Sequence, residues 1–390
     1  MDFTLSQEHR LLGDTARKIG EQFGLEYWRD LDIKKEYASE FWQAVCDAGL
    51  SGVALSEDYG GAGLGMLEMA LVIENLAAGG GGSTVGQLFM NNPIFGGVSI
   101  SKYGSEDQKR AYLPKLISGE LRCAMALTEP DVGSNTLSIK TFARRDGNKW
   151  RIRGSKIWIT GVPQAQKILV ITRTTRVEDA PKRTHGITMF LIDVDREGLN
   201  HTPIDKLGTH TNPSSTVHFD DVVAGPDEVL GTIDGGWPEL LNVLNTERIV
   251  TTAGLVGAGN LALKLGVAYA NDRKVFGGKP IGGYQGLQFP MAQAQAGLQC
   301  ARLMNHKAAW LHDTGQSYGS ESNTAKLIAV QAATHAIERA MQTMGGMGYS
   351  REMHVERLWR DARLFHFAPV SEEMLLNYIA VHDLGLPKGY

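Results

Sequence analysis

The chain has 390 residues, with 39 lysines and arginines against 43 aspartates and glutamates, so its formal net charge is −4. This length predicts two or three domains of roughly 150 residues each, with a large buried core. The near-neutral charge balance excludes a basic face that binds nucleic acid, and the 43% hydrophobic composition excludes a disordered chain.

Cysteine usage and the N-terminus indicate the cell compartment. Cys46, Cys123 and Cys300 are widely spaced and form neither a CxxC pair nor a Cys/His cluster, so we expect no disulfide scaffold and no metal site. The start Met1–Thr4 lacks the basic and apolar regions of a signal peptide, and no uncharged apolar run is long enough to span a membrane. These features predict a cytoplasmic protein with no membrane partner.

Hydrophobic periodicity divides the chain into three parts. Residues 1–122 have apolar positions at helical spacing, and residues 231–390 return to that spacing. Between them, in 123–230, short apolar runs such as Ile168–Thr172 and Ile187–Ile192 predict strands without intervening helices, which favours an antiparallel sheet. The sequence therefore predicts an α+β fold with an N-terminal helical domain, a middle antiparallel β-domain and a C-terminal helical domain. Two further short strands are expected at Trp150–Arg153 and Ile157–Thr160.

Two glycine motifs resemble nucleotide-binding loops, but their context favours helix packing. Gly257 and Gly259 begin a G-x-G-x-x-A match, yet the preceding Glu247–Ala253 already has helical period, so no strand leads into the loop. The run Gly79–Gly82 could cradle a phosphate, but no Lys-Ser/Thr pair follows it. A turn between helices is therefore the better interpretation of this run.

One segment offers groups suited to a polar ligand. An extended apolar stretch from Cys123 leads into Thr128 and then a turn at Gly133 and Ser134, which presents backbone N–H groups and hydroxyls. Further along, Trp158 supplies a large aromatic face near the Thr160 hydroxyl. Together they predict a pocket for a flat ring, the alternative being that Trp158 is a core residue.

Several blocks in order along the chain resemble the acyl-CoA dehydrogenase family over essentially its whole length. They are Leu127-Thr128-Glu129-Pro130 with Gly133-Ser134, Trp158-Ile159-Thr160, Arg273 with Phe276-Gly277, Tyr284-Gln285, Gln342 with Gly345-Gly346 and Gly348, and Arg360-Asp361-Ala362. The resemblance implies an N-terminal helical domain, a middle β-domain and a C-terminal four-helix bundle, which agrees with the segmentation from periodicity.

The resemblance also implies that FAD is the cofactor. The residues that would hold its isoalloxazine ring are Met125, Leu127, Thr128, Gly133, Ser134, Trp158 and Thr160. Those that would meet its pyrophosphate and adenine from a neighbouring subunit are Arg273, Phe276 and Gln285. Those that would complete the dinucleotide site are Gln342, Gly345, Gly346, Ser371 and Glu373. The chain departs from the family at Gly277-Gly278, where relatives usually have a single glycine, and this leaves the register of Gln285 open.

The catalytic base is the second departure. Many relatives carry a glutamate in a Tyr-Glu-Gly-Thr segment, where this chain has Ala368-Pro369-Val370-Ser371, and Pro369 cannot take a proton. The isovaleryl and long-chain branches instead carry a glutamate directly before an arginine on a C-terminal helix, which Glu247 and Arg248 match. Glu247 is therefore expected to be the base. The alternative is a solvated glutamate near a helix start.

The surroundings of Glu247 generate further expectations. Helical spacing places Thr251, Gly254 and Ala258 on its face, and these small residues are expected to leave room for a ligand. Burial against flavin and substrate would raise the pKa of Glu247 towards neutrality, as a general base requires. The residues expected to bind substrate are Ser134, Asn245 and Arg248.

Pro369 also lacks the backbone N–H that relatives use to hold the thioester oxygen. Losing one such donor can cost about 3 kcal/mol of transition-state stabilisation. Either Val370 or a side chain replaces it, or the chemistry has changed.

The resemblance implies FAD-dependent α,β-dehydrogenation of an acyl-CoA thioester to the 2-enoyl-CoA, with Glu247 as base and flavin N5 as hydride acceptor. It further implies electron transfer to an electron-transfer flavoprotein and a homotetramer built as a dimer of dimers. One alternative is a non-catalytic, flavin-binding partner subunit of a heteromeric enzyme. The other is a family member with altered chemistry, of the enoyl-CoA reductase or desulfinase type.

Overall fold

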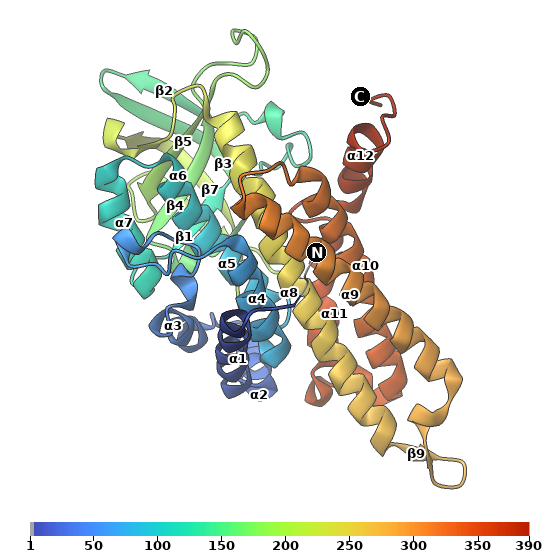
Figure 1. The fold of residues 1–390 in the computed structure, drawn as a ribbon. Helices are drawn as coiled ribbons and strands as arrows, with labels where there is room; N and C mark the ends of the chain where they lie inside the picture. Colours follow the sequence, from blue (N-terminus) through green and yellow to red (C-terminus); the bar gives the residue numbers. More distant parts are fainter. Residues whose placement is uncertain (1–3, 390) are drawn as a thin grey trace.

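The structure is a computed structural model that describes residues 4–389. The start of the chain at Met1–Phe3, on which the expectation of no signal peptide depends, lies outside the described residues. Helices occupy residues 7–118, a β-sheet follows between residues 123 and 230, and helices return from residue 236 to residue 382 (Figure 1). This order confirms the predicted class, with a β-domain between two helical domains.

The N-terminal helices pack around a core that includes Trp28 and Phe41. They are α1 (Gln7–Gln22), α2 (Leu25–Lys34), α3 (Ser39–Asp47), α4 (Met66–Leu76), α5 (Thr84–Phe89), α6 (Ser99–Tyr103) and α7 (Glu106–Ser118). The glycine run expected to form a turn between helices lies between α4 and α5: the segment Ala77–Gly81 is kinked at Gly80, whose φ is +156°, and Gly82 has a φ of +62° just before α5 begins. A Cβ added to Gly79 would lie 2.4 Å from the backbone of Gly20 in α1, so the glycine permits close packing of two helices.

The middle domain is a largely antiparallel sheet of eight strands. They are β1 (Cys123–Ala126), β2 (Phe142–Asp146), β3 (Lys149–Thr160), β4 (Lys167–Arg173), β5 (Ile187–Asp193), β6 (Leu199–Pro203), β7 (Ser214–Ala224) and β8 (Val229–Leu230). The order is β6-β7-β3-β2-β4-β5-β8, while β1 and β2 both pair with β4 in parallel. The two short strands expected between residues 150 and 160 form one continuous strand, β3, whose register against β7 shifts twice.

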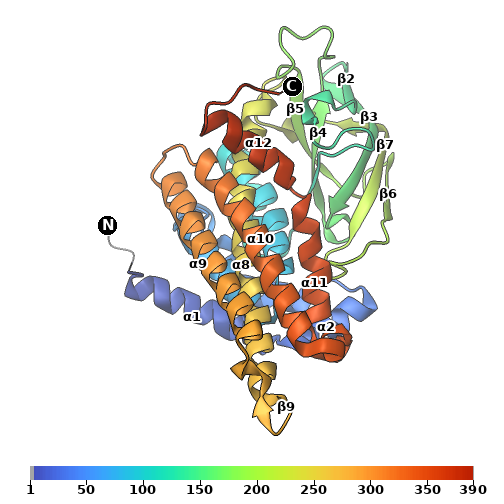
Figure 2. The same cartoon turned by 90° about the vertical axis from the view of Figure 1, so that its right-hand side faces the viewer.

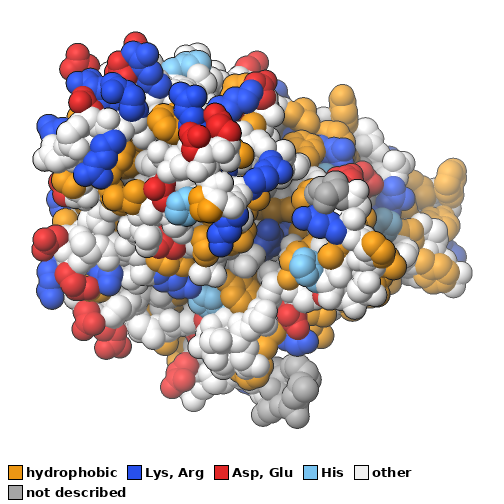
Figure 3. Space-filling model, turned by 90° about the horizontal axis from the view of Figure 1, so that it is seen from above, with side chains coloured by type: hydrophobic (Ala, Val, Ile, Leu, Met, Phe, Trp, Pro, Cys, Tyr) orange, Lys and Arg blue, Asp and Glu red, His pale blue; other side chains and the backbone are white. Residues whose placement is uncertain are grey.

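Seen from above, the face of the molecule in Figure 3 has positive and negative side chains interspersed. On β3, Arg151 donates to Asp146 at 2.6 Å and Arg153 pairs with Asp221. Because these exposed charges are paired, they leave little net charge on this part of the sheet.

The C-terminal domain is built on three long helices that run side by side, with two shorter ones packed on the third (Figures 1 and 2). They are α8 (Gly236–Asp272), α9 (Gln285–Asp313), α10 (Gly319–Met344), α11 (Val355–Arg363) and α12 (Glu372–His382). A small hairpin, β9 (Lys274–Val275) with β10 (Lys279–Pro280), joins α8 to α9 at the end far from the sheet (Figure 1).

Helix α8 is the core helix of the molecule. Of the described residues, this helix alone is long and apolar enough to cross a membrane, although the sequence has no fully uncharged run of that length. However, 83% of its most apolar window is buried inside the protein, as expected for a core helix. Gly257 and Gly259 lie within it, which confirms helix packing as their role.

The small residues near Glu247 are covered by protein, contrary to expectation. A Cβ on Gly254 would lie 3.0 Å from the Cα of Gly86 in α5, and Thr251 and Ala258 are both buried. The small side chains therefore let α5 and α8 approach closely, and they do not leave space for a ligand.

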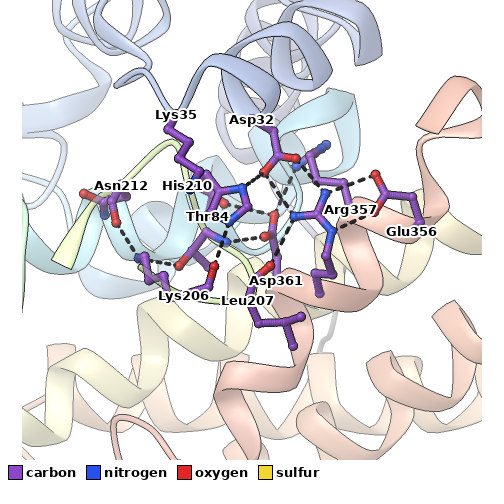
Figure 4. Close-up of polar contacts among 12 residues, drawn as sticks. Asp32, Lys35, Thr84, Lys206, Leu207, His210, Asn212, Glu356, Arg357 and Asp361 are labelled. Carbon is purple, nitrogen blue, oxygen red and sulfur yellow. Dashed lines mark hydrogen bonds and ion pairs between the residues drawn. The ribbon is translucent and has the colours of Figure 1, made fainter. Parts of the chain in front are cut away.

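A buried polar network joins the three parts of the chain (Figure 4). Asp32 on α2 accepts hydrogen bonds from Arg360 on α11 at 2.6 Å and pairs with His210, between β6 and β7, at 2.9 Å. Arg360 also donates to Glu356 at 2.6 Å. Burial alone would raise the pKa of Asp32, but its hydrogen bonds to His210 and Arg360 hold it well below the usual range.

Replacing Asp32 with asparagine should therefore lower the free energy of unfolding by about 3 kcal/mol at pH 7, because Arg360 loses a buried anionic partner. The apparent thermal midpoint as a function of pH measures this. Since the pKa of Asp32 is depressed in the folded state, its contribution is present above about pH 4 and is lost as the pH falls further. The matched control, D30N on the same helix, breaks an exposed pair and should cost under about 0.5 kcal/mol. Equal midpoints for both variants would contradict the role of this network.

Candidate functional site

The structure brings together the two segments expected to form a pocket for a flat ring. The N–H of Ile157 donates to the carbonyl of Thr128 at 2.9 Å, and the Lys156 ammonium donates to the carbonyl of Leu127 at 2.8 Å. The end of β1 therefore lies against the last residues of β3. This places Met125, Leu127 and Thr128 in the same region as Trp158 and Thr160, as the sequence predicted.

Trp158 has an unusual backbone conformation that exposes its indole. Its φ is +61°, which is rare for a bulky residue, and its side chain is 54% exposed. It lies where β3 has one extra residue relative to β7, between Lys156 and Ile159. Without this bulge, strand alternation would place Trp158 on the same buried face as Lys156. The alternative that Trp158 is a core residue is therefore wrong, and strain of this kind is typical of functional sites.

A buried ion pair holds this region in place, and no local sequence pattern indicates the pairing. The Lys156 ammonium lies 3.0 Å from the Glu129 carboxylate, which also accepts the N–H groups of Lys140 at 2.6 Å and Thr141 at 2.8 Å. Burial lowers the pKa of Lys156 to about 8. Burial opposes ionisation of Glu129 too, but the Lys156 charge and the hydrogen bonds lower its pKa overall. The pair fixes the turn after Thr128.

The turn after Glu129 is open. Gly133 and Ser134 are exposed, and a Cβ added to Gly133 would meet no atom within 4 Å. No described residue exchanges a hydrogen bond with the Ser134 hydroxyl, whereas the Thr160 hydroxyl pairs with Ser214 at 3.0 Å. The Gly133 carbonyl accepts a hydrogen bond from the Thr136 hydroxyl at 3.2 Å, so the groups left open to a ligand are the Gly133 N–H and the Ser134 hydroxyl.

Glu247 lies in the buried part of α8, with only 3% of its surface exposed. One turn earlier, Leu244 packs in the same apolar cluster as Met125, which brings the candidate base near the β1 segment. Within residues 4–389, no group donates a hydrogen bond to the Glu247 carboxylate. Burial raises the pKa of Glu247 to about 8, although the charges of Arg248 and Lys326 oppose the rise. The alternative of a solvated glutamate is wrong.

Arg248 and Asn245 lie one turn apart on α8 and contact each other. Arg248 donates from Nη1 to the Asn245 side-chain oxygen, while its buried Nε has no partner among the described residues. Burial lowers the pKa of Arg248, and Glu247 and Tyr318 act in the opposite direction. Arg248 therefore retains a donor that a ligand can use.

The residues expected at the adenine end lie far from Trp158 in the same chain. Arg273, Phe276 and Gln285 are exposed on or beside the β9–β10 hairpin, at the opposite end of α8 from the sheet (Figure 1). Arg273 follows Glu247 by 273 − 247 = 26 positions along the helix, a distance of roughly 39 Å. The extra glycine lies in the hairpin turn between the paired residues Val275 and Lys279. One chain therefore cannot bring all the predicted residues to one ring.

The last group of predicted residues is also divided between the two ends. Gln342 and Gly345 line a groove of about 390 Å³ at the end of α10. Neither Gly345 nor Gly346 would contact any atom within 4 Å through an added Cβ, so a ligand can approach the backbone there. Ser371 instead caps α12, where it accepts the N–H of Met374 at 3.4 Å, and Glu373 lies in the first turn of that helix.

Comparison with known proteins gives consistent matches. Three family models match, the N-terminal domain of acyl-CoA dehydrogenases at residues 6–120, the middle domain at 124–222 and the C-terminal domain at 234–382. The chain is 39% identical to an acyl-CoA dehydrogenase, FadE12, of Mycobacterium tuberculosis, over 100% of this chain and 99% of that one. It is 31% identical to a 3-(aryl)acrylate reductase of Clostridium sporogenes, over 96% of this chain and 98% of that one.

Solved structures give the same result. A glutaryl-coenzyme A dehydrogenase in complex with glutaryl-CoA superposes with a TM-score of 0.95 at 30% identity, covering 100% of this chain and 98% of that one. A glutaryl-CoA dehydrogenase from Mycobacterium smegmatis, in complex with FADH2, gives 0.91 at 27% identity, covering 99% and 97%.

The cofactor is FAD, and the residues present fit it. The exposed Trp158 indole offers a flat apolar surface, and the free Ser134 hydroxyl and the Gly133 N–H offer polar groups for the edge of a ring. Glycines at Gly345 and Gly346 leave space for a dinucleotide at the far end.

Two tryptophans on β3 provide a matched test of the ring site. W158A should weaken FAD retention while leaving the stability of the apoprotein within about 0.5 kcal/mol, because the side chain is exposed. W150A should cost about 3–5 kcal/mol of stability, because Trp150 is buried against Phe190. The flavin-to-protein ratio after desalting and the thermal midpoint of the apoprotein measure the two effects. Full flavin retention by W158A would contradict the site.

Proposed function

The chain belongs to the acyl-CoA dehydrogenase family of flavin-dependent oxidoreductases, and on that premise we propose that it converts an acyl-CoA thioester into the 2-enoyl-CoA. The observation that carries the proposal is the Glu247 carboxylate, which is buried near the β1 segment with no hydrogen-bond donor from the described residues. An acyl-CoA substrate fits the family.

Glu247 takes the α-proton of the substrate. When bound, FAD supplies at N5 the acceptor for the β-hydrogen, which leaves as hydride. The C–H electrons at the α-carbon form the new double bond, so the proton on Glu247 and the hydride balance the two hydrogens lost. Because burial raises the pKa of Glu247 to about 8, its ionised form is a stronger base towards the weakly acidic α-proton than an ordinary carboxylate.

Arg248, Asn245 and Ser134 orient the substrate. The unpaired Nε of Arg248 lies on the residue after the base, and its guanidinium is held by Asn245. We expect the Arg248 guanidinium to bind a polar group of the thioester or pantetheine, because its N–H groups can donate hydrogen bonds to such a group. The Ser134 hydroxyl lines the site from the β-domain side.

The Val370 N–H replaces the thioester donor that Pro369 cannot provide. It belongs to the next residue along, and no group in the described part of the chain accepts it. The Val370 carbonyl is held by Lys326 at 2.7 Å, which restricts the orientation of this segment. A fixed backbone N–H of this kind stabilises developing negative charge on an oxygen.

Glu247→Gln tests the base. It should slow anaerobic flavin reduction by about 10³-fold, because the amide cannot accept the α-proton, while FAD remains bound. Titration with straight, branched and cyclic acyl-CoA esters, followed by flavin absorbance, measures this and identifies the substrate. Glu239→Gln, on the first turn of the same helix, keeps its bonding to Thr232 and should reduce flavin as the unchanged protein does. Wild-type rates in E247Q would refute the assignment.

Val370→Pro tests the donor. Removing the N–H should lower the maximal rate of flavin reduction by about 10²-fold with FAD still bound. The control V370A keeps the N–H and should stay close to the wild-type rate. If V370P reduced flavin at the V370A rate, the thioester donor would have to lie elsewhere.

We also propose a homotetramer, built as a dimer of dimers, that passes its electrons to an electron-transfer flavoprotein. Exposed apolar side chains cover the β9–β10 hairpin and α9, which supports subunit contacts there. They are Phe276, Tyr284, Phe289, Leu303 and Trp310. The separation of Arg273 from Glu247 along α8 also supports a site completed by a neighbouring subunit. The three free cysteines support a cytoplasmic location.

A reductase acting on an enoyl-CoA is the second candidate. A Glu247 whose pKa is about 8 is mostly protonated at pH 7, so it can deliver a proton to the α-carbon in the reverse direction. The likeness to a 3-(aryl)acrylate reductase supports this reading. The reductase is favoured if enoyl-CoA oxidises the reduced flavoprotein and no acyl-CoA bleaches the oxidised flavin. If the bound flavin reacts with neither enoyl-CoA nor acyl-CoA, the non-catalytic partner subunit is favoured.

A further inference from the structure

We infer that Lys206 is a positioning residue for the bound flavin. Its ammonium group, acting through the Ser214 hydroxyl, fixes the Thr160 hydroxyl as a hydrogen-bond donor towards the ring. A cation behind that donor favours the reduced cofactor over the oxidised one, because reduction brings a hydride, and with it one negative charge, to the ring. The inference rests on the proposed flavin-dependent function, through the ring site at Trp158, and it does not depend on which group is the base.

Three side chains form a chain of hydrogen bonds that ends beside the ring site. Lys206 lies between β6 and β7, at the edge of the buried network in Figure 4, and its Nζ donates to the Ser214 hydroxyl at 3.2 Å. Ser214 begins β7 and pairs with Thr160 on β3, and their hydroxyl oxygens are 3.0 Å apart. Thr160 is half-buried and follows the exposed Trp158 by two residues. The ammonium group is therefore two hydrogen bonds from the Thr160 hydroxyl.

The direction of this chain follows from which groups can donate. An ammonium group has no acceptor, so Ser214 Oγ accepts from Lys206. Ser214 is buried, and among the described residues its hydroxyl hydrogen has the Thr160 oxygen as its acceptor. Because a buried hydroxyl needs a partner for its hydrogen, Ser214 donates to Thr160 and does not accept from it. The hydrogen of Thr160 then has no acceptor between residues 4 and 389, and it is left for a ligand.

The ligand atom that Thr160 meets must therefore be an acceptor. The edge of an isoalloxazine ring carries carbonyl oxygens, which accept hydrogen bonds in both oxidation states. These oxygens are more negative in the reduced ring, and a donor binds a charged acceptor more strongly than a neutral one. A donor that is itself polarised by a cation through a second hydroxyl strengthens this preference.

Anchoring of the loop between β6 and β7 does not explain the charge on Lys206. Backbone hydrogen bonds already hold the end of this loop against β3 and β6. The Gly161 N–H donates to the Pro213 carbonyl at 2.8 Å, and the Ile204 N–H donates to the Ser214 carbonyl at 2.8 Å. A neutral side chain would therefore be enough to complete the loop.

The ammonium group of Lys206 has only neutral partners. Besides Ser214, Nζ donates to the Thr209 hydroxyl at 2.7 Å and to the Asn212 carbonyl at 2.8 Å, and no carboxylate of the described chain forms an ion pair with it. Asp361 is bound to Arg357 instead, at 3.3 Å. Burial lowers the pKa of Lys206 to about 8, although the Asp361 charge opposes the fall, so most molecules carry the ammonium at pH 7. A cation kept without a bonded anion leaves its field available to the ring site.

The test measures the midpoint potential of bound FAD at pH 7 by equilibration with a reference dye, in the absence of acyl-CoA. K206Q keeps a donor but loses the charge. It should weaken the binding of reduced FAD relative to oxidised FAD by about tenfold, which lowers the potential of this two-electron couple by about 30 mV. K206R keeps the charge and should keep the wild-type potential. The control K35Q removes an exposed lysine that pairs with Asp205, and it should also keep the wild-type potential.

A double-mutant cycle tests the route through Ser214. S214A breaks the chain but leaves the charge in place, so it should also lower the potential, and adding K206Q to it should lower the potential little further. Loosening of the loop alone would weaken both oxidation states equally and leave the potential unmoved.

Three results would overturn the inference: a wild-type potential in K206Q, an equal fall in K206R, or falls in K206Q and S214A that simply add. If W158A retained all its FAD, the ring site would fail and this inference with it. Wild-type flavin reduction by E247Q would instead refute the proposed base and leave the measured potentials unaffected.

Discussion

The burial of one long helix, α8, is the constraint on which the rest of the structure depends. Its residues belong to the cores of all three domains: Val243 and Ile249 pack with the N-terminal helices, Leu240 with the sheet, and Leu255 with α9 and α10. Between Thr246 and Gly259 nearly every residue of α8 is buried, so an ionisable group in this part of the helix is expensive to charge. The position of Glu247 on this helix therefore sets its proton affinity.

Several carboxylates are buried where different parts of the chain meet, but they accept different numbers of hydrogen bonds. Asp32 and Glu129 each accept several hydrogen bonds and stay ionised, so they act as structural links. Glu247 accepts none from the described residues and is influenced only through space by Arg248 and Lys326. The difference in hydrogen bonding, at similar burial, separates a structural carboxylate from one free to exchange a proton.

The cofactor region depends on a local irregularity and on chain length. The bulge in β3 turns Trp158 outwards, and the Glu129–Lys156 pair holds the neighbouring turn against it. The length of α8 then carries Arg273 far from Trp158, so within one chain the predicted adenine-end residues lie apart from the predicted ring site. The β9–β10 hairpin at that end is exposed.

The sequence by itself determined the order of the domains, the helical context of Gly257 and Gly259, and the blocks that identify the family. Periodicity records which face of an element is apolar, and short-range spacing records local turns. Only the tertiary structure decided what covers each face. Thr251, Gly254 and Ala258 could equally have faced a ligand or a helix, and α5 occupies that space. Likewise, Trp158 is exposed because of a register shift against β7, and Lys326 finds its carbonyl partners 39 and 44 positions along the chain. Such pairings depend on the packing of distant segments, which local pattern does not encode.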